Sequence, residues 1–180
     1  DETALGVPFF VMDRAPGEAI HDTQLQDWFT SATDDFRAGI CRQWIGAFAS
    51  LARMQPLAVL GDPVSPEDDA LMWQHFAARA GCGELVALFE RLLAARAPRS
   101  GPPALVHGDT KLSNLMWADG RVSAMLDWEM ALNGEPLADL GYLLYGFESP
   151  HHGPTTPMKQ PGMARRAEII ALWEGHSGRS

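Results

Sequence analysis

The sequence predicts an α+β fold that is mainly α-helical and contains one small β-hairpin. Three observations indicate this fold. Most apolar residues recur at helical spacing, helix-start residues precede several of these segments, and one Asp-Gly turn separates two short apolar runs. The chain has 180 residues, which is enough for a single domain with its own hydrophobic core.

The elements are expected in a defined order along the chain. The apolar run 7–12 predicts a strand that enters a Pro/Gly turn, and the first helix is expected over 34–54 with Thr33 or Asp34 as its N-cap. A second helix begins after Ser65, with Pro66 at its first position, and a third is expected over 84–97. Asp119-Gly120 predicts a hairpin between the runs 114–118 and 121–128. Helical spacing returns over 136–147, and a last helix follows residue 163.

Composition excludes several classes of protein. A net charge of −9 and a pI of about 5.0 argue against a protein that binds nucleic acid by neutralising its phosphates. No apolar run is long enough for a membrane span, so we expect no membrane partner. The two cysteines, Cys41 and Cys82, show no metal-ligand spacing and suggest reduced thiols in a cytoplasmic protein. The oligomeric state is not readable from the sequence.

Three polar residues around the predicted hairpin suggest a chemical site. Asn114 precedes the first strand and Asp127 ends the second, so the hairpin should bring them together. An amide oxygen and a carboxylate are suitable ligands for Mg²⁺, which leaves Asp109 free to accept a proton from a hydroxyl group. Each residue alone would also fit a turn or a strand end. Their joint spacing favours phosphoryl transfer, because "HGDTKLSN" matches the kinase pattern H-R-D-x-x-x-x-N with Gly108 in place of Arg.

The segments "VHGDTKLSNLMW", "MLDWEMALNGEPLADLGYLL" and "PFFVMDRAPG" resemble the aminoglycoside phosphotransferase and choline kinase-like family. Within it they are most similar to the kinase-like domains associated with acyl-CoA dehydrogenases. The resemblance implies a protein-kinase-like C-terminal lobe with a small catalytic β-hairpin, ATP and Mg²⁺ as cofactors, and a small-molecule hydroxyl substrate.

The resemblance also implies roles for individual residues. Asp109 matches the catalytic base and Lys111 a residue that approaches the transferred phosphate. Asn114 and Asp127 match the metal ligands. His107 and Asp139 match residues that support the catalytic loop, and the backbone of Asp13 to Ala15 matches the hinge that pairs with adenine.

The family pattern places a β-rich N-terminal lobe before the hinge, and this lobe is expected to be absent from the 180 residues. Residues 1–15 would then be the hinge strand and linker, and residues 16–180 the helical lobe, with the catalytic and metal loops at 105–130. We expect such a fragment to be inactive alone. A non-catalytic binding or scaffold fragment and, less well supported, a metal-dependent phosphohydrolase are the alternatives. An aminoglycoside, a choline-like amine and a hydroxyacyl thioester all remain open as acceptors.

Overall fold

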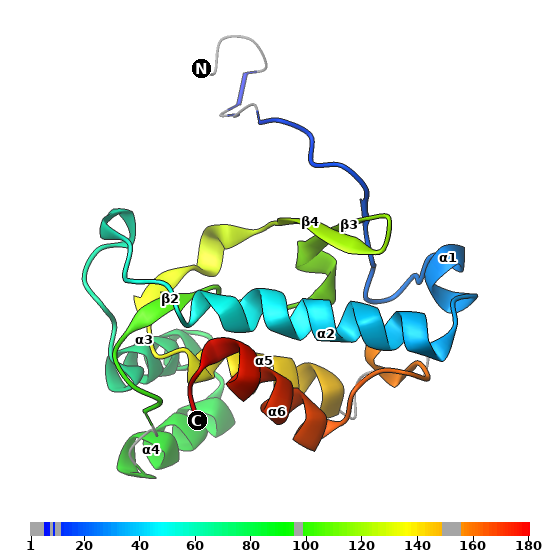
Figure 1. Cartoon of the computed structure of the whole chain (residues 1–180). Coiled ribbons are helices and arrows are strands. Elements are labelled where there is room, and N and C mark those ends of the chain that lie inside the picture. Colours follow the sequence, from blue (N-terminus) through cyan, green and yellow to red (C-terminus); the bar gives the residue numbers. More distant parts are fainter. Residues whose placement is uncertain (1–5, 8, 10–11, 96–98, 149–155) are drawn as a thin grey trace.

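A long central helix organises the computed structural model, which describes residues 6–7, 9, 12–95, 99–148 and 156–180. This helix is α2 (Asp34–Leu51), and the short α1 (Asp27–Thr30) precedes it. On one side of α2 lie α5 (Leu137–Glu148) and α6 (Arg166–Ser177), and on the other lies the hairpin of β3 and β4 (Figure 1). The fold is therefore mixed α and β and mainly helical, as the sequence predicts.

The sequence of α2 explains its central position. The Thr33 side chain accepts a hydrogen bond from the Phe36 backbone N–H at 3.2 Å, which confirms the expected N-cap. An apolar stripe at helical spacing is fully buried and includes Ile40, Trp44 and Phe48. The Trp44 ring stacks on Phe147 of α5 with 5.1 Å between ring centroids. The core thus forms where α2 packs against α5, α6 and the hairpin.

A buried arginine fastens the start of α2 to distant segments. The Arg37 guanidinium donates to the backbone carbonyls of Phe29, Ala32 and Pro161 at 3.2, 2.7 and 2.6 Å. It donates as well to the Thr30 carbonyl at 3.1 Å and pairs with Asp34 at 2.6 Å. Because a buried charge is costly unless it is paired, this saturated guanidinium fixes α1 and the segment around residue 161 against α2.

Two small antiparallel sheets complete the body. The first has the strand order β1-β3-β4, with β1 (Glu18–Ala19), β3 (Leu115–Ala118) and β4 (Arg121–Met125). Asp119-Gly120 forms the turn between β3 and β4, as expected. The second sheet pairs β2 (Ala104–Val106) with β5 (Leu132–Gly134). Short 3-10 turns occur at Ala58–Leu60 (η1), Leu112–Asn114 (η2), Trp128–Met130 (η3) and Pro157–Lys159 (η4).

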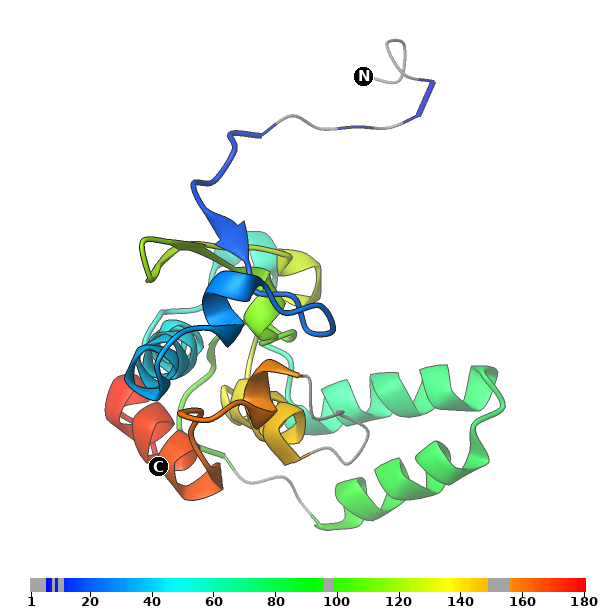
Figure 2. The same cartoon turned by 90° about the vertical axis from the view of Figure 1, so that its right-hand side faces the viewer.

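Two further helices form a hairpin that extends from the body (Figure 2). They are α3 (Pro66–Arg79) and α4 (Gly83–Ala95), and they run antiparallel. Ser65 caps α3 by accepting from the Asp68 backbone N–H at 3.0 Å, so both predicted start signals, Ser65 and Pro66, are confirmed.

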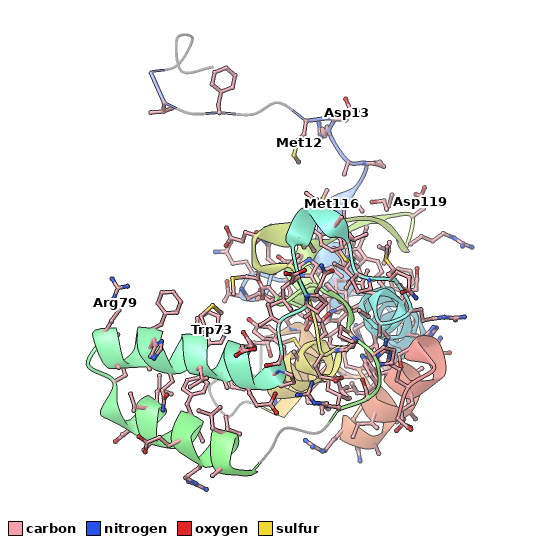
Figure 3. The ribbon with its side chains drawn as sticks, turned by 90° about the vertical axis from the view of Figure 1, so that its left-hand side faces the viewer. Met12, Asp13, Trp73, Arg79, Met116 and Asp119 are labelled. Carbon is pink, nitrogen blue, oxygen red and sulfur yellow. The ribbon has the colours of Figure 1, made fainter. Side chains whose placement is uncertain are left out.

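Some expected elements differ from the structure. Val7, Phe9 and Met12 have no strand conformation, and the rest of the expected strand 7–12 lies outside the described residues. A strand needs a pairing neighbour, and the segment at Met12 and Asp13 lies away from the body (Figure 3). The strand expected over 121–128 ends at Met125, because Asp127 takes a left-handed conformation and η3 follows. In the described part of the chain no helix is long and apolar enough to cross a membrane.

Candidate active site

The catalytic loop begins where β2 ends and is held by a buried carboxylate of α5. Asp139 is 2% exposed, and its two carboxylate oxygens accept hydrogen bonds from the backbone N–H groups of His107 and Gly108, both at 2.9 Å. Burial raises the pKa of Asp139 to about 6, although the two N–H groups act in the opposite direction. From α2, Trp44 donates its indole N–H to the Thr110 carbonyl at 2.8 Å. Two helices therefore fix the backbone of the loop.

Gly108 occupies the position where the protein-kinase pattern has Arg, and its surroundings explain the difference. Its φ is +83°, in the region that favours glycine. A Cβ atom at this position would lie 2.6 Å from the backbone oxygen of Met130 and 2.9 Å from its Cβ. The loop and η3 therefore approach too closely for any side chain at residue 108.

His107 connects the catalytic loop to the loop that contains Asp127. Its Nδ1 accepts the backbone N–H of Asp109 at 3.3 Å, so its Nε2 carries the proton and donates to the Leu126 carbonyl at 2.9 Å. Burial lowers the pKa of His107, against the Leu126 carbonyl and the nearby carboxylates of Asp109 and Asp127. The neutral ring therefore holds the two loops together, and this is the supporting role that the resemblance implies for His107.

Asp109 presents one bonded and one unbonded oxygen. Its Oδ2 accepts from the Lys111 ammonium at 2.9 Å and from the Asn114 amide at 3.0 Å. Its Oδ1 is buried and has no hydrogen-bond partner among the described residues. Burial raises the pKa of Asp109, but the hydrogen bonds from Lys111 and Asn114 and the nearby Tyr142 hydroxyl outweigh it, so the pKa lies below its usual value. The carboxylate is thus charged and oriented, and one of its oxygens is left without a hydrogen bond among the described residues.

The structure adds two neighbours that the sequence did not indicate. Tyr142 follows Asp139 by one helical turn and lies close enough to influence the pKa of Asp109, although it makes no hydrogen bond of good geometry to Oδ1. Its spacing on α5 is the one signal that could have identified it. Asp22 accepts from the Ser113 hydroxyl at 2.7 Å across 91 positions in the chain, a separation that leaves no local signal.

Asn114 has its amide nitrogen fully engaged. It donates to the Asp109 carbonyl at 2.8 Å as well as to the Asp109 carboxylate. This orientation turns the amide oxygen away from Asp109. Its backbone carbonyl accepts from the Leu126 N–H at 2.8 Å, which places Asn114 beside the residue that precedes Asp127. The structure therefore brings Asn114 and the Asp127 loop together, as the hairpin argument predicts.

Asp127 is exposed and has a strained backbone. Its φ of 62° and ψ of 59° are left-handed, which is uncommon for a residue other than glycine. Leu126 is fixed on both of its backbone groups, by Asn114 and by His107. An oriented amide oxygen and an exposed carboxylate fit the oxygen ligands that Mg²⁺ prefers, with its other positions left to water or phosphate. No cluster of three His, Cys, Asp or Glu side chains suited to a metal occurs among the described residues.

The remaining predicted site residues lie elsewhere. Asp13 and Ala15 precede β1, and no interaction in the described part of the chain joins them to the catalytic loop. Trp128, which is not one of these predicted residues, follows Asp127 and borders the site. It is 41% exposed, its ring centroid lies 4.7 Å from that of His107, and its indole N–H donates to the Met125 carbonyl at 3.0 Å.

The helical lobe carries a braced H-G-D loop, an oriented asparagine and a strained aspartate after a β-hairpin. This arrangement is typical of a kinase-like phosphotransferase fold. The family model described as "Phosphotransferase enzyme family" matches residues 1–167, so the chain belongs to this family. A solved structure titled as a putative aminoglycoside phosphotransferase from Ralstonia eutropha shares the fold. Its TM-score is 0.74 at 23% identity over 99% of this chain and 58% of that protein.

Curated relatives are similar over parts of their length. The mouse (Mus musculus) acyl-CoA dehydrogenase family member 10 is 26% identical over 160 residues, which are 86% of this chain and 15% of the mouse protein. The rat (Rattus norvegicus) acyl-CoA dehydrogenase family member 11 is 43% identical over 79 residues, 38% of this chain and 10% of the rat protein. The chain thus spans a minor part of these relatives. The resemblance identified from the catalytic-loop segments is confirmed.

Proposed function

We propose that the chain provides the catalytic base and the metal ligands of an ATP- and Mg²⁺-dependent phosphotransferase that acts on a hydroxyl group. The observation that supports this best is the asymmetric carboxylate of Asp109. Two side chains, Lys111 and Asn114, donate to Oδ2, and Oδ1 is buried without a partner among the described residues. A buried oxygen without a partner is costly, so it is expected to be satisfied when a substrate binds.

In the proposed reaction, Asp109 Oδ1 accepts the proton of the acceptor hydroxyl, and the hydroxyl oxygen attacks the γ-phosphorus of ATP. The bond from the γ-phosphorus to the bridging oxygen breaks, and ADP leaves. Lys111 and Asn114 keep Oδ1 directed at the acceptor by holding Oδ2. His107 and Asp139 act through the backbone and do not exchange protons with the substrate.

The metal would be held by the amide oxygen of Asn114 and the carboxylate of Asp127. Bound Mg²⁺ supplies charge neutralisation for the nucleotide phosphates. The backbone at Asp13 and Ala15 would pair with adenine, and a second lobe would cover the phosphates. Since the 180 residues include no glycine-rich phosphate loop, we expect the chain on its own to bind ATP weakly and to turn over negligibly.

Calorimetry and a phosphate-transfer assay test the proposal on two polypeptides, the 180-residue chain and an extended one that carries a β lobe. The acceptor panel contains an aminoglycoside, choline and a hydroxyacyl thioester, the last suggested by the names of the acyl-CoA dehydrogenase relatives. In the extended polypeptide, Asp109→Asn should reduce kcat at least about 100-fold and leave the affinity for Mg-ATP nearly unchanged.

Asp127→Asn provides the complementary variant. It should weaken Mg-ATP binding at least about tenfold and leave metal-free ATP binding unchanged. Glu174→Gln, on the exposed side of α6, is the matched carboxylate-to-amide control and should behave as the unmodified chain. Equal transfer by Asp109→Asn and the unmodified protein would refute the assignment. Nucleotide or acceptor binding without any transfer would favour the non-catalytic scaffold instead.

A further inference from the structure

The hairpin of α3 and α4 leaves several large apolar side chains exposed to solvent. The helix α4 reads "GELVALFERLLAA", yet none of its residues is buried, and Leu85, Leu88 and Leu92 are 47%, 44% and 50% exposed. The helix α3 exposes Trp73 and Phe76 at 38% and 53%. The two helices pack chiefly on each other. Figure 3 shows them side by side, with Trp73 in the middle of α3 and Arg79 at the far end of the hairpin.

Helix geometry places these side chains on one face. The side of α4 that packs on α3 is marked by its half-buried residues Val86, Phe89 and Leu93, and the side of α3 that packs on α4 by Ala70, Gln74 and Ala77. At about 100° per residue, the three exposed leucines lie about 100° around α4 from its side that packs on α3. Trp73 and Phe76 lie about 95° around α3 from its side that packs on α4. The rotation has the same sense in both helices. Because the helices are antiparallel, equal rotations point to the same face of the hairpin.

The spacing on this apolar face is that of helix–helix packing. Leu85, Leu88 and Leu92 follow the 3-4 pattern of a heptad seam, and the rings of Trp73 and Phe76 lie 5.7 Å apart beside it. Such a seam is complementary to another helix with the same spacing. A contiguous exposed apolar patch of this kind typically marks a protein interface.

Charges beside the seam are complementary to a second copy of the same helix. An antiparallel pair of α4 helices with its two-fold axis near Leu88 places Glu84 of one copy near Arg91 of the other, because the two residues are four and three positions from Leu88. The symmetry repeats the pair, so two attractive contacts of opposite charge flank the leucines. Glu84 and Arg91 are both exposed and therefore available for this pairing.

We propose that the hairpin face formed by Trp73, Phe76, Leu85, Leu88 and Leu92 binds a second copy of the chain, so that two hairpins form an antiparallel four-helix bundle. This interface is independent of the phosphotransferase reaction and of the Asp109 site.

Sedimentation equilibrium tests the proposal at chain concentrations of about 1 to 100 µM, a range in which a weak dimer dissociates. Leu88→Lys should raise the dimer dissociation constant at least about 100-fold, because the two-fold axis applies the loss twice. Ala87→Lys is the matched control, because Ala87 is next to Leu88 in the sequence but is exposed on a side of α4 away from the leucines. It should change the dimer dissociation constant less than about twofold. Circular dichroism should show the same helix content for both variants.

Charge reversal distinguishes a symmetric dimer from non-specific association. Glu84→Arg and Arg91→Glu should each raise the dissociation constant about fivefold, and the double variant should restore it to within about twofold. A monomer at 100 µM, an equal effect of Leu88→Lys and Ala87→Lys, or a double variant as weak as the single ones would each overturn the proposal. Association through another surface would produce the second of these outcomes.

Discussion

Replacement of Gly108 by alanine tests the close approach between the catalytic loop and η3. At a φ of +83°, an alanine pays about 1–2 kcal/mol for a left-handed backbone. Its Cβ would also lie 2.6 Å from the backbone oxygen of Met130 and 2.9 Å from the Met130 Cβ. A backbone oxygen cannot swing away as the end of a flexible side chain can, so crowding adds about 1–3 kcal/mol. We therefore expect Gly108→Ala to lower the free energy of unfolding by about 2–5 kcal/mol in total.

A second glycine separates the two costs. Gly178, which ends α6, has a left-handed conformation with a φ of 70° and a ψ of 22°, and a Cβ added there would have no atom within 4 Å. Gly178→Ala should therefore lose about 1–2 kcal/mol, from the backbone alone. Urea unfolding, followed by circular dichroism, gives both values on the same chain. Equal losses for the two variants would refute the idea that Met130 excludes a side chain at residue 108.

Three further predictions concern buried groups. Arg37→Lys should lower the free energy of unfolding, measured by urea titration, by about 3 kcal/mol. A lysine cannot reach the carbonyls of Phe29, Ala32 and Pro161 together. Arg42→Lys, at an exposed position of the same helix, should change the free energy of unfolding little. Asp139 has its pKa raised from 3.8 to about 6, so its contribution to stability is present below pH 4 and is lost as the pH rises through 6. Relative to Asp139→Asn, the unmodified chain should lose about 2 kcal/mol between pH 4 and 7, and a pH-independent difference would contradict this. Burial raises the pKa of Cys41 to about 11, so the native chain at pH 8 should show one fast-reacting thiol, Cys82, in a thiol titration, and two fast thiols would show that Cys41 is accessible.

The elements that the sequence predicted correctly depend on local signals. The Ser65 cap, the helical spacing of α2 and the Asp119-Gly120 turn each act within a few residues, and each is present in the structure. The pairing of β2 with β5 joins Val106 to Leu132, and β1 joins a two-residue strand to β3. Strands this short carry no periodicity of their own, because their position is set by the segments that they pair with.

The site likewise contains features with a local sequence signal and features without one. The spacing of Asp109, Asn114 and Asp127 around a hairpin was sufficient to expect Asn114 near the Asp127 loop, since the hairpin itself is a local feature. Some of the contacts that hold the loop come from other elements. Trp44 of α2 donates to the Thr110 carbonyl, for example, and no local pattern indicates this bond. The roles of His107 and Asp139 followed from the resemblance, and their hydrogen bonds supply the physical reason for those positions.

The polar groups of the site differ in how completely they are hydrogen-bonded within the chain, and this difference supports the roles proposed for them. Both oxygens of Asp139 and both ring nitrogens of His107 have partners within the chain. Asp109 Oδ1 has none among the described residues, and Asp127 is exposed on a strained backbone. A group that is saturated inside the fold can fix a loop but has nothing left to bind a ligand. A buried oxygen that is held in place without a partner has free energy to gain from a bound substrate. In this chain the loop that holds this oxygen is joined to the Asp127 loop by the bond from His107 to the Leu126 carbonyl.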